Sequence, residues 1–357
     1  MRVSSLMRTA VVAMVGFCAG SAWGQNTGTA SQPAKEQRSS DQSSTDQPVR
    51  SARVDSALSD YRPVPGISGS IKSVGSGTMN NLMGHWREEF NRFYPGVRIE
   101  VEGKGSGLAP TALASGASQF GPMSREMKAS EIEEFERNVG HKPTQLRVGI
   151  DCIAIFVHRD NPLTELTMAQ AKRVFSVDGA SMTWGELGVT DPAFKDRPIG
   201  LFGRLSNSGT YGYFKEHVLE NADFKKGVRE MEGNAGVVQA VGADRFAMGY
   251  ASFGYKTADV KPLRIKGEEG GAIMPSYETA ESGEYPIARY LYVYLNHAPG
   301  QTLDPLRAEF VRMMLSRVGQ ECVLKDGYYP ISATVAKEEL AKVGLEVAPA
   351  AQGTPRQ

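Results

Sequence analysis

The sequence has few cysteines, few histidines and no net charge, and each shortage argues against a class of protein. The 3 Cys among 357 residues are too few for a disulfide-built scaffold or a zinc site made of several cysteines. The 5 His are scattered, without the paired spacing of a histidine metal site. The 40 Lys and Arg only balance 40 Asp and Glu, whereas nucleic-acid binding needs a basic excess. We therefore expect no metal and no nucleic-acid partner.

Long apolar runs are also missing after the first 24 residues. Residues 1–24 begin with basic residues, continue with a short apolar stretch and end on Ala22-Trp23-Gly24. This order is typical of a cleavable secretory signal peptide. Phe17 stands where a lipoprotein signal has a small residue, which argues against a lipid anchor at Cys18. We expect the mature protein to be exported and soluble.

The next segment, residues 25–63, has the composition of a disordered linker. It is rich in Ser, Gln, Asp, Thr and Ala, with Tyr61 as its one aromatic residue and no periodic apolar pattern. Such a segment cannot bury enough apolar surface to offset the entropy of ordering it. The fold should begin near Ile67, and residues 346–357 should form a flexible tail.

Strand and helix patterns alternate through the rest of the chain, whose length suggests about two domains. We expect strands over 71–74, 97–101, 150–157, 199–202, 247–253 and 290–295, and helices over 79–93, 112–114, 131–138, 166–175, 211–218, 237–241 and 310–318. The continuous apolar run 150–157 is typical of a strand buried on both faces. The alternation favours an α/β fold with a largely parallel sheet.

Three loops share one design, in which a strand ends, a Gly/Ser/Thr run turns and a helix starts. They contain Gly75-Ser76-Gly77-Thr78, Gly105-Ser106-Gly107 and Ser208-Gly209-Thr210. Unpaired N–H groups and the helix dipole make such helix starts anion-binding, although an ordinary helix cap is the better explanation of any single loop. Arg204 and a fourth loop with Ser124-Arg125 add guanidinium groups, which match oxyanions unless they serve structural ion pairs. Together the four loops predict an oxyanion site.

Catalytic motifs are weak by comparison. The sequence contains neither a G-x-x-x-x-G-K-[ST] phosphate loop nor a credible G-x-S-x-G nucleophile elbow. Cys152 and Cys322 remain after signal cleavage, and they are either one disulfide or two small buried residues. Nothing in the residues indicates a cofactor.

These four loops, in this order, resemble the periplasmic phosphate-binding proteins of ABC transporters, within the type 2 periplasmic binding protein superfamily. Flanking segments fit as well, namely 151–157 with Asn161-Pro162-Leu163, 285–289, 319–321 and 327–331. The resemblance covers residues 67–333 and implies a two-lobed Venus-flytrap fold, with mixed sheets flanked by helices and two crossover hinge strands. Lobe 1 would hold 67–152 and 288–345, and lobe 2 would hold 153–287.

The resemblance also implies what the protein does. It would be a monomeric periplasmic protein, not an enzyme, that captures inorganic phosphate between its lobes and delivers it to ABC permease subunits in the inner membrane. Carried over motif by motif, the phosphate ligands are Ser76, Gly77, Thr78, Ser106, Ser124, Arg125, Arg204, Ser208, Gly209 and Thr210, with Gly107 as a weaker candidate.

One departure from the family leaves the ligand open. Some members place an Asp after the Ser that corresponds to Ser124, and this Asp accepts the proton of monohydrogen phosphate. This chain has Arg125 there, as in a branch with a Ser-Arg motif. Asp151, near the expected hinge, is a candidate substitute. A binder of another oxyanion, such as sulfate or molybdate, therefore stays an alternative. A secreted phosphoester hydrolase is a further alternative from a different class.

Overall fold

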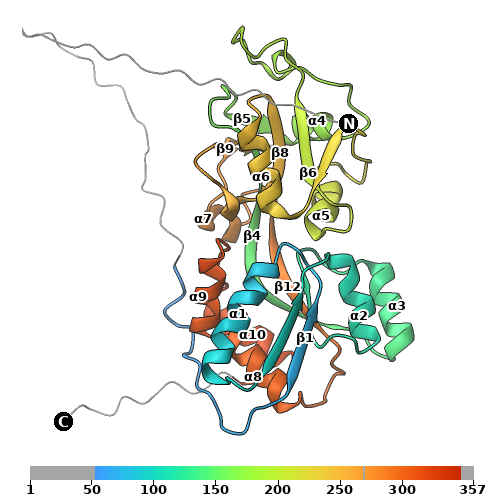
Figure 1. The fold of residues 1–357 in the computed structure, drawn as a ribbon, viewed down its shortest axis with the longest axis vertical. Helices are drawn as coiled ribbons and strands as arrows, with labels where there is room; N and C mark the ends of the chain where they lie inside the picture. The colour runs from blue at the N-terminus through green and yellow to red at the C-terminus, as the bar shows by residue number, and fades with distance from the viewer. Residues whose placement is uncertain (1–52, 268–269, 347–357) are drawn as a thin grey trace, which may run out of the picture. The chain divides into compact units, whose positions relative to one another are not determined.

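The computed structural model describes residues 53–267 and 270–346, which belong to one compact unit. The expected signal peptide, the expected linker up to residue 52 and the expected tail from residue 347 lie outside the described residues. Figure 1 shows two groups of helices and strands joined by the long strands β4 and β12. We call these groups lobe 1 and lobe 2.

Hydrophobic cores define the two lobes. Lobe 1 has cores formed by residues between 58 and 148 and between 291 and 345, around Trp86, Phe90 and Phe310. Lobe 2 has cores formed by residues between 150 and 287, around Trp184 and Tyr250. These cores do not test the limits at 152/153 and 287/288, which stay predictions.

The elements of lobe 1 are three strands and seven helices. They are β1 (Ser70–Val74), α1 (Asn80–Phe93), β2 (Arg98–Glu102), the 3-10 helix η1 (Ser106–Leu108), α2 (Ala109–Ala114), β3 (Gly121–Met123), α3 (Ala129–Val139), α8 (Pro305–Met314), α9 (Arg317–Lys325) and α10 (Ala333–Ala341). The two linking strands are β4 (Thr144–His158) and β12 (Ala288–Leu295).

Lobe 2 alternates short strands and helices. Its elements are β5 (Glu165–Thr167), α4 (Met168–Phe175), η2 (Gly185–Leu187), β6 (Gly200–Arg204), α5 (Gly209–His217), β7 (Val228–Met231), α6 (Gly233–Ala243), β8 (Ala247–Ser252), η3 (Phe253–Tyr255), β9 (Val260–Pro262), β10 (Arg264–Lys266), β11 (Ala272–Ile273) and α7 (Tyr277–Glu281).

Strand β4 ties the lobes together by changing its partner halfway along. It pairs antiparallel with β12 from Thr144 to Cys152 and antiparallel with β8 from Ile153 to Val157. The sheet runs in the order β3-β12-β4-β8-β6-β7, with β9 also on β4. As the apolar run 150–157 predicted, β4 is buried there throughout. The expectation of a largely parallel sheet is wrong, because only β6 pairs parallel in it, with β7 and β8.

Two expected helices are not continuous helices in the structure. Residues 165–167 form strand β5, and Thr167 caps α4 by accepting a hydrogen bond from Gln170 N at 3.0 Å. The single helix expected over 310–318 is two helices, α8 and α9. The chain turns so tightly between them that a Cβ on Gly319 would lie 2.1 Å from Met313 O.

The C-terminal part of the expected linker is ordered. Leu58 is 3% exposed and belongs to the lobe 1 core, and Tyr61 donates a hydrogen bond to Glu309 at 2.8 Å. Arg317 of α9 binds the carbonyls of Ser56 and Leu58, each at 2.8 Å. Residues 53–63 therefore pack on lobe 1, although their composition alone predicts disorder. The contacts of Leu58 and Tyr61 with the core and the hydrogen bonds from Arg317 stabilise this packing.

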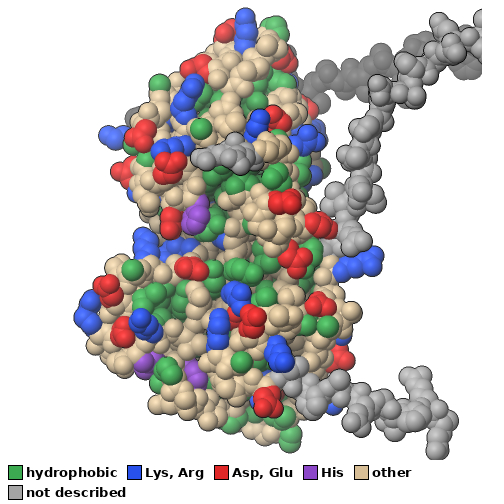
Figure 2. Space-filling view, turned by 180° about the vertical axis from the view of Figure 1, so that it is seen from behind, with side chains coloured by type: hydrophobic (Ala, Val, Ile, Leu, Met, Phe, Trp, Pro, Cys, Tyr) green, Lys and Arg blue, Asp and Glu red, His purple; other side chains and the backbone are tan. Residues whose placement is uncertain are grey.

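Neither sign of charge dominates the surface that Figure 2 shows, where Lys and Arg alternate with Asp and Glu. Among the described residues, no helix has the length and apolar content that a membrane crossing requires. The same residues contain no group of three or more His, Cys, Asp or Glu placed to hold a metal ion.

The disulfide that the sequence left open is absent. Cys152 and Cys322 are free, buried thiols that lie in different cores, the first in lobe 2 and the second in lobe 1. The alternative of two small buried residues is the one that the structure shows.

This finding predicts that a reducing agent leaves the unfolding midpoint unchanged. A disulfide closing so long a loop would have contributed about 5 kcal/mol. Urea unfolding of the mature protein with and without dithiothreitol measures the difference. A clear fall in the midpoint under reducing conditions would show that the two thiols are bonded.

Candidate functional site

The predicted loops of lobe 1 come together as a cluster of serine hydroxyls. Ser76 Oγ donates to Ser124 Oγ at 3.0 Å, and Ser124 N donates to Ser106 Oγ at 3.1 Å. All three serines are buried, at 1% exposure or less. Glycine is required beside them, since a Cβ on Gly75 would lie 2.2 Å from Pro122 O. The structure thus joins the predicted loops of Ser76, Ser106 and Ser124 on one wall.

Lobe 2 supplies the opposite wall. Strand β6 ends at Arg204, and α5 begins at Gly209 after a short turn. Ser208 caps α5 by accepting a hydrogen bond from Thr210 N at 3.1 Å. The N-terminus of α5, with its unpaired N–H groups, therefore faces the same region as the Arg204 side chain.

The two walls touch directly at threonine and glycine. Thr78 Oγ1 and Thr210 Oγ1 lie 2.8 Å apart, which joins lobe 1 to lobe 2. A Cβ on Gly209 would lie 2.3 Å from Ser106 Oγ and 2.5 Å from Ser124 Oγ. Only glycine at position 209 lets α5 approach the serine cluster this closely. Of the predicted ligands, the structure brings together Ser76, Thr78, Ser106, Ser124, Arg204, Ser208, Gly209 and Thr210.

The Arg204 guanidinium is buried without a carboxylate partner. The residue is 3% exposed, and Nη1 donates to Thr78 Oγ1 at 3.3 Å and to Asn234 Oδ1 at 2.5 Å. Its Nε is buried with no acceptor. Among the ion pairs of the described residues, none includes Arg204. Burial lowers the pKa of this guanidinium, with a further contribution from the positive charge of Arg289.

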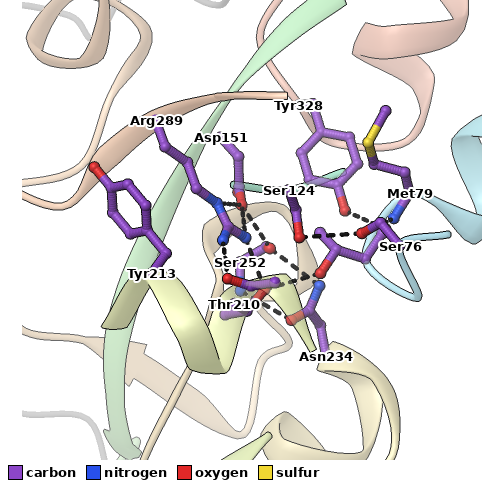
Figure 3. A network of polar contacts seen from close by, with 12 residues as sticks. Ser76, Met79, Ser124, Asp151, Thr210, Tyr213, Asn234, Ser252, Arg289 and Tyr328 are labelled. Carbon is purple, nitrogen blue, oxygen red and sulfur yellow. Dashed lines mark hydrogen bonds and ion pairs between the residues drawn. The ribbon is translucent and has the colours of Figure 1, made fainter. Parts of the chain in front are cut away.

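A second buried arginine, Arg289, was not among the predicted ligands. It lies opposite Asp151 in the pairing of β12 with β4, and its Nη2 is 2.8 Å from Asp151 Oδ2, with both side chains 1% exposed. Arg289 also donates to Thr210 Oγ1 at 2.7 Å and to Gly209 O at 3.2 Å. Figure 3 shows Arg289 between Asp151 and Thr210, with Tyr213 beside it. The hinge strands therefore hold the start of α5 in place.

These contacts close into a ring that passes through both lobes and the hinge strands. Ser252 Oγ donates to Asp151 Oδ2 at 2.9 Å and accepts from Asn234 Nδ2 at 3.0 Å. Ser252 therefore connects Asp151, the partner of Arg289, with Asn234, the partner of Arg204. The ring consists of Asp151, Arg289, Thr210, Thr78, Arg204, Asn234 and Ser252. Each guanidinium donates to a threonine oxygen, so the protons of the two hydroxyls remain for each other and for a bound anion.

Arg125, a predicted phosphate ligand, forms an ion pair within lobe 1. Nη1 and Nη2 each lie 2.7 Å from a carboxylate oxygen of Glu131, at the first turn of α3. Burial raises the pKa of the Glu131 carboxyl, but hydrogen bonds from Arg125 and Lys128 N outweigh it, so this pKa lies below its usual value. Arg125 therefore forms the structural ion pair that the sequence left as an alternative, and its role as a ligand stays a prediction.

Other predicted residues support the site rather than present free donors. The N–H of Ser76 donates to Pro122 O at 2.7 Å. The proposed proton acceptor, Asp151, already receives Arg289 and Ser252 on Oδ2. A Cβ on Gly107 would lie 3.9 Å from Arg125 Nη2, which places Gly107 beside that arginine. As Gly77 lines the cleft with Arg204, its position is compatible with the prediction.

The cleft outside this cluster has a cavity of about 500 Å³. It is lined by residues of both lobes, among them Gly77, Lys104, Arg204, Asn207 and Asn234. At its rim, Asn207 Nδ2 donates to Lys104 O at 2.8 Å across the lobes. The arginine without a carboxylate therefore borders a hollow that both lobes line.

Comparison with known proteins decides the family. A model of the PBP superfamily domain matches residues 27–318. The phosphate-binding protein PstS of Pseudomonas aeruginosa PAO1 is 47% identical over 301 residues, which are 82% of this chain and 93% of the relative. This chain belongs to the PstS family of the PBP superfamily. PstS of Staphylococcus haemolyticus is 27% identical, over 80% of this chain and 89% of the relative.

Solved structures agree with the PstS fold. A phosphate ABC transporter substrate-binding protein from Clostridium perfringens has a TM-score of 0.63 at 24% identity, covering 74% of this chain and all of that one. A possible phosphate binding protein from Planctomyces limnophilus has a TM-score of 0.60 at 26% identity, covering 78% and 98%. The two-lobed α/β architecture of periplasmic binding proteins is thus confirmed.

Sequence reasoning missed Arg289, Asn234 and Ser252. Arg289 ends a segment that fitted the PstS family, but it follows no glycine loop. Asn234 is the second residue of α6. No serine or threonine precedes this helix, so its start did not match the pattern of the predicted loops. Ser252 closes β8 inside an apolar run, and no local signal marks it.

The buried ion pair generates a stability prediction. Asp151→Asn leaves Arg289 buried beside a neutral group, so the free energy of unfolding should fall by about 3–5 kcal/mol. The matched control is Asp60→Asn, whose partner Arg317 is partly exposed, and it should cost less than about 1 kcal/mol. Urea unfolding of both variants measures the two losses. Equal losses of unfolding free energy in the two variants would contradict the conclusion that the buried Asp151–Arg289 pair stabilises the fold more than an exposed ion pair does.

Proposed function

We propose that this chain is an extracytoplasmic solute-binding protein that captures inorganic phosphate between its two lobes and delivers it to an ABC permease. The leader-like residues 1–24 and the PstS family support export to the periplasm. A monomer that carries out no reaction is sufficient for this function, because capture and delivery need only binding and lobe closure.

The observation that carries the proposal is the buried Arg204. A guanidinium taken out of water is costly unless an anion pairs with it, and the described residues provide only neutral acceptors. An oxyanion in the cleft would supply the missing charge and accept from Nε. The N-terminus of α5 and the hydroxyls of Thr78 and Thr210 add neutral donors.

The size of the expected affinity follows from these donors. A micromolar dissociation constant corresponds to about 8 kcal/mol. Charge-assisted hydrogen bonds contribute about 1.5–3 kcal/mol each, so several of them reach this value after desolvation. The names of the relatives, phosphate-binding proteins, favour phosphate over other oxyanions.

Calorimetric titration with phosphate, arsenate, sulfate and molybdate tests the proposal. We expect phosphate and arsenate to bind, since they share geometry and protonation, and sulfate to bind far more weakly. Replacing Arg204 by Gln should weaken phosphate binding on the order of 100-fold, as two charge-assisted hydrogen bonds are lost. The control, Arg229→Ala, removes an exposed charge on the neighbouring strand β7 and should change affinity little. Sulfate binding as tight as phosphate binding would overturn the assignment.

The close approach at Gly209 gives a second prediction. Gly209→Ala places a methyl group against Ser106 and Ser124, so the lobes cannot close fully and phosphate affinity should fall at least about tenfold. Gly84→Ala in α1 is the matched control, because its Cβ would meet nothing within 4 Å. Titration of both variants, with unfolding curves to confirm that they fold, measures the effect. An unchanged affinity for Gly209→Ala would show that closure does not require this contact.

A further inference from the structure

The three arginines around the site differ in the group that holds each of them. Arg289 pairs with Asp151 at 2.8 Å, and Arg125 pairs with Glu131 at 2.7 Å. Arg204 has an amide, Asn234, in the corresponding place. Two of the three positive charges are therefore neutralised inside the protein, and one is not.

Asn234 is buried and hydrogen-bonded in the site, as Asp151 is. It is 2% exposed, and its Oδ1 accepts from Arg204 Nη1 at 2.5 Å and from Ser252 N at 3.4 Å. Its Nδ2 donates to Ser252 Oγ at 3.0 Å. These opposite requirements fix which end of the amide faces Arg204, since only the oxygen can accept from two donors.

No other acid of the described residues replaces the missing carboxylate. Glu232, two positions before Asn234, is exposed and lines the same cavity, but it forms no ion pair with Arg204. Asp151 is reached from Asn234 only through Ser252, and Arg289 already neutralises it. An amide at position 234 thus orients the guanidinium without cancelling its charge.

We propose that Asn234 is a positioning residue, which holds Arg204 with a neutral oxygen and so keeps its positive charge for the bound anion. The inference rests on the proposed function and names a residue that acts on the ligand through Arg204. A carboxylate at this position has nearly the same shape and would compete with the anion for the same guanidinium.

The test compares Asn234→Asp with Asn234→Ala by phosphate titration. The Asp variant keeps the shape and adds an internal anion, so its affinity should fall on the order of 100-fold. The Ala variant removes the contact but leaves Arg204 charged, so its affinity should fall less than about tenfold. A merely structural role for Asn234 predicts the opposite order, because alanine removes more contacts than aspartate. That opposite order would overturn the proposal, as would a loss in the Ala variant that matches the Asp variant.

Asn81→Asp is the matched charge control. Asn81 is exposed on the same cavity, and its Nδ2 donates to Tyr255 OH at 3.2 Å. A carboxylate at this position would accept from the same hydroxyl, so the contact is kept with its direction reversed. Adding the negative charge at this place should change phosphate affinity less than about threefold, since solvent screens it. A loss as large as that of Asn234→Asp would show a general charge effect instead of a local one.

Urea unfolding without phosphate tests the same pairing independently of the ligand. Asn234→Asp should destabilise an Arg204→Gln background more than it destabilises the wild type, because only the wild type offers a cation to the new carboxylate. Equal losses in both backgrounds would overturn the inference. A wild type that binds no phosphate would instead overturn the proposed function, while the unfolding comparison still decides the role of Asn234.

Discussion

The site depends on one buried positive charge that the protein leaves without a carboxylate. Arg204 is placed by the end of β6, and it is held by a threonine of lobe 1 and an asparagine of lobe 2. Burying a cation in this way is unfavourable for the empty protein, and an anion between the lobes removes the penalty. The same charge therefore favours both binding and closure, because the anion gains most when both walls surround it.

The Asp151–Arg289 pair on the hinge strands, by contrast, carries no net charge. Strand β4 exchanges β12 for β8 between Cys152 and Ile153, and the Asp151–Arg289 pair lies beside this exchange. The pair fixes the start of α5 through Thr210 without adding net charge near the ligand. Positioning and charge are thus assigned to different arginines, so Arg289 fixes the start of α5 while the charge of Arg204 remains available to an anion.

The sequence predicted the fold class and the clustering of the loops, because glycine-rich helix starts and apolar strands are local signals. Ser76, Ser106 and Ser124 meet as expected from loops at the ends of strands. It left open whether Arg125 serves an ion pair and did not single out Glu131, six residues away, as the partner. It did not predict that Arg289 and Asn234 complete the ring, since those contacts join residues far apart in the chain. The order of residues 53–63 was missed for a similar reason, as Arg317 holds them from the other end of the chain.

A crystal structure of the chain with phosphate tests the central claim most directly. The account predicts an anion bound between the lobes, with Arg204 donating to it and still touching Asn234, and with N–H groups of α5 and the Thr78 hydroxyl completing its contacts. Arg289 should keep Asp151, and Arg125 should keep Glu131. Phosphate bound by Arg125 or Arg289, with Arg204 turned away from the anion, would contradict the account.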